Sequence, residues 1–105
     1  MNGHRFTRDF GGGLTGTAVI SISPPSLDVS WSPNPPRGPS ALKIKDAYIA
    51  WMLDIQKFIA QESGAPTAYT SINERHLVDM WSIDPDGTVL QVMKDSKKVK
   101  PKKVR

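Results

Sequence analysis

Apolar residues alternate with polar or smaller ones along residues 17–32, and a period of two is typical of β-strands with one buried face. The apolar positions are Ala18, Ile20 and Ile22 in the first run and Leu27, Val29 and Trp31 in the second. Between the two runs lies Ser23-Pro24-Pro25-Ser26, whose prolines lack a backbone donor and therefore belong in a connection. The pattern predicts a β-hairpin over residues 17–32.

The period changes to that of an α-helix over residues 41–62. Ser40 is a suitable N-cap residue, while Gly64 and Pro66 are suited to ending the helix. At about 100° per residue, one wide face is apolar and is expected to cover a sheet. Its residues are Ile44, Ala47, Tyr48, Trp51, Met52, Ile55, Phe58 and Ile59.

A second apolar stripe, formed by Leu42, Ile49, Leu53 and Ala60, lies on the opposite side of this predicted helix. Three interpretations remain open. The helix is sandwiched within its own fold, the stripe binds a partner subunit, or its residues are isolated exposed apolar side chains. For a protein interface, the candidate residues are Leu42, Ile49 and Leu53, together with Phe6 and Phe10 near the N-terminus.

A second hairpin is predicted over residues 77–93. Asp84-Pro85-Asp86-Gly87 has the composition of a turn, since proline presets φ and glycine permits a positive φ. Just before it, Ser71 and Glu74 have the spacing of a capping box, which predicts a short helical turn over residues 71–76.

The predicted organisation is a single α+β domain over residues 14–93, with two antiparallel hairpins packed as one small sheet on the long helix. Residues 33–40 form a proline-rich connector within it. Residues 1–13 are expected to be a flexible arm, although its two phenylalanines favour packing on the core or on a neighbouring subunit. Residues 94–105 are expected to be a basic tail without a part in the core, because their apolar content is too low.

Charge is distributed unevenly along the 105-residue chain, whose net charge is +4. From residue 94 onward there are seven basic residues and one acid, a net charge of +6, whereas the preceding residues carry −2. The basic residues are Lys94, Lys97, Lys98, Lys100, Lys102, Lys103 and Arg105. Lysines along an extended chain neutralise phosphates and release counterions, so the segment indicates nucleic-acid binding. An acidic protein surface is the other candidate partner, and a merely solubilising end is the simplest interpretation.

Residues able to support catalysis are few. The chain has no cysteine, and its two histidines, His4 and His76, lack a recognisable nucleophile beside them, although His76 and Asp79 could form an acid–base pair. Asp84 and Asp86 fit a turn better than a calcium loop, and Gly11-Gly12-Gly13 lacks the lysine of a phosphate loop. We therefore expect no enzyme activity, cofactor, metal or small-molecule substrate.

The sequence thus predicts a small non-enzymatic binding protein that contacts nucleic acid or a nucleoprotein assembly through its basic tail. The alternative is a structural or assembly subunit, for example a viral or phage accessory protein, that binds protein neighbours through its arms and second stripe and forms a homo-oligomer or larger assembly. No apolar run of about 18 residues and no signal-peptide pattern is present, so no membrane contact and a cytoplasmic or virion location are expected.

Overall fold

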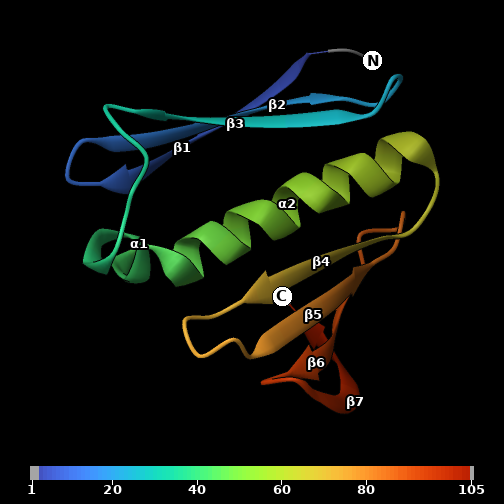
Figure 1. The fold of residues 1–105 in the computed structure, drawn as a ribbon. Helices are drawn as coiled ribbons and strands as arrows, with labels where there is room; N and C mark the ends of the chain where they lie inside the picture. Colours follow the sequence, from blue (N-terminus) through green and yellow to red (C-terminus); the bar gives the residue numbers. More distant parts are fainter. Residues whose placement is uncertain (1–2, 105) are drawn as a thin grey trace. The chain divides into compact units, whose positions relative to one another are not determined.

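The structure, a computed structural model, describes residues 3–104 and is built from seven strands and two helices in this part of the chain (Figure 1). The first half contains β1 (His4–Gly11), β2 (Leu14–Ser21), β3 (Ser26–Ser32) and α1 (Pro39–Lys43). The long helix α2 (Lys45–Ser63) follows, and then β4 (Thr67–Ile72), β5 (Val78–Ile83), β6 (Val89–Lys94) and β7 (Lys97–Val104).

These strands form two separate antiparallel sheets, so the prediction of one sheet of two hairpins on a helix is wrong. One sheet has the order β1-β2-β3 and the other the order β4-β5-β6-β7 (Figure 1). The predicted hairpins, β2–β3 and β5–β6, are present but belong to different sheets. Each gains an edge strand from a segment that was expected to lie outside the fold: β1 from the arm and β7 from the basic tail.

Residue contacts divide the chain into two compact units, Met1–Trp51 and Met52–Arg105, with the boundary inside α2. The first unit holds the three-stranded sheet and the start of α2, and the second holds the rest of α2 and the four-stranded sheet. Each unit has its own set of buried side chains.

The buried side of β2 is the centre of the three-stranded sheet. Ala18 and Ile20 are 0% and 1% exposed, as the alternating pattern predicts, and Gly16 continues the same side of the strand. Register places residues of β1 and β3 beside them, including Phe6 opposite Ala18 and Trp31 opposite Gly16. The expected flexible arm therefore forms a strand, since alternate residues of β1 share this sheet face with the core of β2.

An aromatic cluster of Phe10, Trp31, Tyr48 and Trp51 packs over Gly16 in the first unit. The ring centroid of Phe10 lies 5.3 Å from that of Trp31 and 5.4 Å from that of Trp51. Trp51 is 4% exposed, which confirms it as a core residue, and burial raises the pKa of Tyr48. Phe10 is thus held by the chain's own aromatic residues.

Helix formation begins slightly earlier than predicted. Pro39 occupies the first turn of α1 behind the N-cap residue Gly38, whereas Ser40 donates its hydroxyl to the carbonyl oxygen of Arg37, so the expected N-cap is wrong. The backbone departs from the helix at Ile44, and α2 then continues to Ser63. Its end is as expected, because Gly64 takes a φ of 70° and donates its N–H to the Ala60 oxygen.

The second helix stripe is only partly exposed. Leu53 and Ala60 are 7% and 0% exposed, so the chain itself covers this end of the stripe. Ile49 is half-buried, and Leu42 in α1 is 55% exposed. Three helix residues, all within the described range, were proposed for a protein interface. Leu42 is the only one of the three that is exposed.

The second unit is buried around Trp81 and Ile83 of β5 and Val89 of β6, together with Met52 and Ile55 of α2. Residues paired across strands share a face, so the register divides the sheet into a covered face, which contains Trp81, Ile83 and Val89, and an open face without buried residues. The open face consists of Ala68, Thr70, Ile72, Val78, Met80, Ser82, Leu90, Met93, Lys98 and Lys103.

Two of the three strand connections in this sheet, β4–β5 and β5–β6, have predictions from the sequence to compare with the structure. The turn at Asp84-Pro85-Asp86-Gly87 is confirmed: Gly87 has a φ of 91° and donates its N–H to the Asp84 oxygen. The helical turn over residues 71–76 is wrong, because β4 extends to Ile72. Asn73 then organises a tight loop by accepting the N–H groups of Arg75 and Leu77 on its side-chain oxygen.

Candidate nucleic-acid interface

The basic segment is folded back by a two-residue turn at Asp95 and Ser96. Both residues have positive φ, 50° and 65°, as a type I′ turn requires, and such turns match the twist of a β-hairpin. The turn is also attached to β5: Ser96 donates its N–H to the Val78 oxygen, and its hydroxyl accepts the N–H of Val78 at 2.9 Å. The Asp79 carboxylate accepts the N–H of Asp95.

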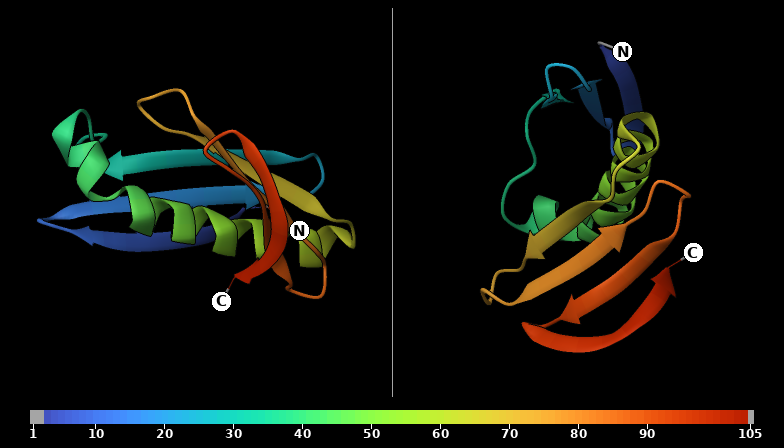
Figure 2. Two further views of the ribbon diagram at one scale, coloured as in Figure 1. Left: turned by 90° about the horizontal axis from the view of Figure 1, so that it is seen from below. Right: turned by 90° about the vertical axis from the view of Figure 1, so that its right-hand side faces the viewer.

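Beyond the turn, β7 pairs with β6 and closes one edge of the four-stranded sheet (Figure 2). Val104 lies opposite the buried Val89, which gives the strand an apolar anchor at its far end. The register shifts between these ends, and Pro101 lies in the shifted part, where a missing N–H is tolerated at a sheet edge. The expectation of a tail without a part in the fold is therefore wrong, and we name β6, β7 and their turn the basic hairpin.

All the lysines of the basic hairpin are exposed. They project from both faces of the sheet, because Lys98 and Lys103 belong to the open face, while Lys102 lies opposite Gln91 on the other face. The complete described set is Lys94, Lys97, Lys98, Lys100, Lys102 and Lys103. Arg105, the seventh predicted contact, lies outside the described residues. The arrangement places exposed positive charges on both faces of an edge strand.

Two local electrostatic features follow from the register. Lys94 and Lys97 are directly opposite each other beside the turn, and facing like charges destabilise a strand pair. At the other end of the hairpin, hydrogen bonds from Thr88 lower the pKa of Asp86, and the nearby positive charge of Lys103 lowers it further. An anion bound beside Lys94 and Lys97 would relieve their repulsion.

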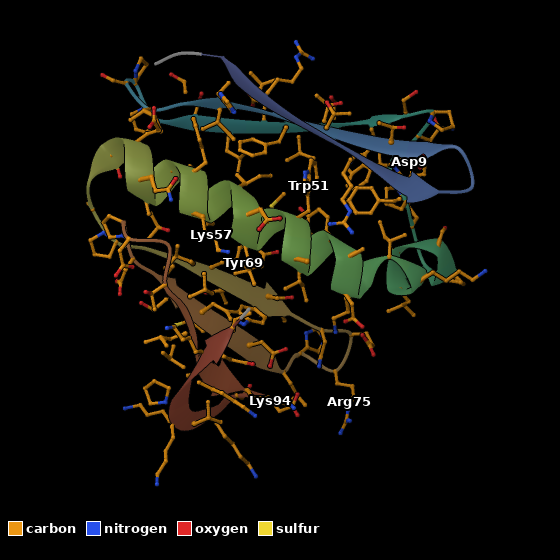
Figure 3. All side chains as sticks on the ribbon, turned by 180° about the vertical axis from the view of Figure 1, so that it is seen from behind. Asp9, Trp51, Lys57, Tyr69, Arg75 and Lys94 are labelled. Carbon is orange, nitrogen blue, oxygen red and sulfur yellow. The ribbon has the colours of Figure 1, made fainter. Side chains whose placement is uncertain are left out.

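Arg75 is a basic residue that the sequence analysis did not assign to this surface. It is exposed in the loop between β4 and β5, which lies at the same end of the sheet as Lys94 at the end of β6 (Figure 3). The signal for this proximity is the antiparallel order β4-β5-β6-β7, which places the β4–β5 loop and the β6–β7 turn at one end of the sheet. The sequence prediction of a helical turn over residues 71–76 did not place Arg75 in a strand connection, so its proximity to Lys94 was missed.

His76 lies at one end of the four-stranded sheet, and Asp84 and Asp86 lie at the other. His76 is exposed in the β4–β5 loop with a φ of 61°, and Asp84 and Asp86 belong to the β5–β6 turn. Within residues 3–104, no three histidine or acidic side chains gather as a metal site requires. No helix in this range is long and apolar enough to cross a membrane.

Comparison with known proteins gives no match: no family model fits the sequence, and no curated protein or solved structure is similar to it.

Proposed function

We propose that this protein is a non-enzymatic nucleic-acid-binding protein whose basic hairpin contacts the phosphate backbone. The observation that carries the proposal is the row of six exposed lysines on a hairpin with a defined turn, a defined register and hydrogen bonds to β5. A fixed strand offers its charges without the ordering cost of a flexible tail. Each phosphate contact releases counterions, which supplies the favourable free energy.

The geometry favours recognition of phosphates over recognition of bases. Lysine acts as a point charge toward phosphate and carries little sequence information. Base stacking would need exposed aromatic rings. Trp51 and Trp81 are 4% and 7% exposed, and Trp31 packs against Phe10 and Tyr48. We therefore expect binding with little dependence on nucleic-acid sequence.

The matching experiment compares two triple variants that remove the same charge. Lys98→Gln, Lys102→Gln and Lys103→Gln remove three of the six lysine charges of the basic hairpin, whereas Lys43→Gln, Lys45→Gln and Lys57→Gln remove three lysine charges from the helices. With a short duplex of random sequence at low salt, the hairpin variant is expected to lose most of its affinity and the helix variant to retain it. Equal losses in both would indicate that net charge alone attracts nucleic acid, and would contradict the proposal.

The alternative function is an assembly subunit, such as a virion or phage accessory protein. The residues proposed for its contacts differ in accessibility. Phe10 packs on Trp31 and Trp51, and Leu53 is only 7% exposed. Leu42 remains exposed, and Phe6 lies half-buried on β1. Of these proposed contacts, Leu42 is therefore the residue most accessible to a protein neighbour.

A further inference from the structure

Four strands lie at sheet edges, and three of them carry features that prevent pairing with another chain. β1 contains charged residues and a register shift near Asp9, and β7 contains lysines, Pro101 and another register shift. β3 carries the exposed Asp28 and is followed directly by Pro33. Charges, prolines and bulges on edge strands are the usual protection against edge-to-edge association.

β4 is the edge without such protection. Its sequence, TAYTSI, contains no charged residue and no proline, and its pairing with β5 runs without a register shift. Within residues 3–104, β5 is its only strand neighbour in the sheet. At its end, Ile72 is 63% exposed, the highest value among the large exposed apolar side chains that the structure describes. An edge strand with no charge, proline or bulge and with an exposed apolar residue is a template for pairing with another strand.

We propose that β4 pairs with β4 of a second copy of this chain, antiparallel and with a two-fold axis at Thr70. Paired residues must share a sheet face, so a two-fold pairing centred on a residue keeps both open faces on the same side. Centred on Thr70, the pairing places Ile72 opposite Ala68 of the second copy and the two copies of Thr70 opposite each other. Apolar and Thr–Thr cross-strand pairs are both stabilising.

A second copy fits this edge because the strand is complementary to itself. β4 brings no like charges together when it meets its own copy, whereas β7 would oppose its lysines. The small Ala68 leaves room for the exposed Ile72 across the pair. Two four-stranded sheets would then join into one sheet of eight strands.

The proposed pairing through β4 does not depend on the proposed nucleic-acid binding. If both are correct, the dimer would present two basic hairpins to one nucleic-acid ligand. The two copies of β7 would lie at opposite edges of the joined sheet. At a strand spacing of about 4.8 Å, seven spacings separate them by about 34 Å before twist is considered. That distance is close to one turn of a B-form duplex, so both hairpins could reach one ligand.

The first test is the solution mass of the full chain without nucleic acid, measured by sedimentation over a wide concentration range. The proposal expects a concentration-dependent shift from 11.6 kDa to twice that mass. Thr70→Lys is expected to abolish the shift, because it places two lysines face to face across the axis. Thr70→Val, the matched control, is expected to retain it. A wild-type protein that stays monomeric, or a dimer that Thr70→Lys leaves unchanged, overturns the proposal.

The second test needs no variant and separates pairing through β4 from any other dimer. Amide hydrogen exchange is measured for the wild-type chain at concentrations below and above the transition. Exchange at alternate residues of β4 is expected to slow in the dimer, with β7 unchanged. Protection that appears elsewhere and not in β4 overturns the assignment. Because neither test contains nucleic acid, failure here leaves the proposed function standing, and failure of nucleic-acid binding leaves the dimer standing.

Discussion

At Gly16, three aromatic rings approach the backbone so closely that a Cβ atom would make unusually tight contacts with all of them. A Cβ atom at this position would lie 3.0 Å from an atom of Phe10 and 3.1 Å from atoms of both Trp31 and Trp51. The rings belong to β1, β3 and α2, so this glycine is where three elements of the first unit meet. Its small size, not an unusual backbone angle, is what the packing requires.

Gly16→Ala is therefore expected to destabilise the protein by roughly 1–3 kcal/mol, the usual cost of overpacking a well-filled core. Thr17→Ala is the control, because residue 17 lies on the other face of β2 and is only half-buried. Urea unfolding followed by tryptophan fluorescence measures both. Unfolding of Gly16→Ala at the wild-type midpoint would show that the rings can move apart freely.

Trp51 was predictable from the sequence and Gly16 was not. The helical period places Trp51 at the centre of an apolar face, and burial of that face is a direct consequence of the hydrophobic effect. A glycine in an alternating run carries no apolar signal of its own. Its importance depends on Phe10, which came from a segment expected to be a flexible arm, so the contact could not be inferred before β1 was known.

Among the turns, the one at Asp95 and Ser96 determines the position of the basic hairpin. Ser96→Ala removes the hydroxyl that accepts the N–H of Val78. A lost hydrogen bond of this kind is expected to cost about 1 kcal/mol, and amide exchange at Val78 should become faster. Ser26→Ala, at an exposed position of β3, is the control. Unchanged exchange at Val78 would mean that the Ser96 hydroxyl does not protect this N–H group.

Along the helices, the second stripe separates into a buried and an exposed part. Leu53→Lys is expected to destabilise the fold by several kcal/mol, because it places a charge at a site that is 7% exposed. Leu42→Lys, at 55% exposure, is expected to change stability by less than about 0.5 kcal/mol. Thermal unfolding compares the two. A stable Leu53→Lys variant would indicate that the leucine is accessible after all.

The basic segment shows why element prediction failed at the ends of the chain. Lysine has a low strand propensity, and a run of like charge opposes folding, so residues 97–104 gave no strand signal of their own. The strand forms because Val104 pairs with Val89 and because Asp95 and Ser96 adopt a turn without the glycine that usually identifies it. Pairing with β6 therefore outweighs the low strand propensity of the lysines in β7.

For the molecule as a whole, strand periodicity identified the two central hairpins but not the sheets to which they belong. A period of two reports which residues face a core, and carries no information about the neighbouring strand. The edge strands β1, β4 and β7 were therefore left out, and with them the division into two sheets. Charge, by contrast, was predictable in full, since the uneven distribution between residues 94–105 and the remainder is a property of the sequence alone.

The central claim, that the basic hairpin binds nucleic acid through its phosphates, is tested most directly by the salt dependence of binding to a random duplex. Each phosphate contact contributes about −0.9 to the slope of log affinity against log salt concentration. Affinity is therefore expected to fall steeply with salt, and the double change Lys98→Gln and Lys103→Gln should reduce the slope by about 2. Affinity that is insensitive to salt, or a slope that the double variant leaves unchanged, would contradict the account.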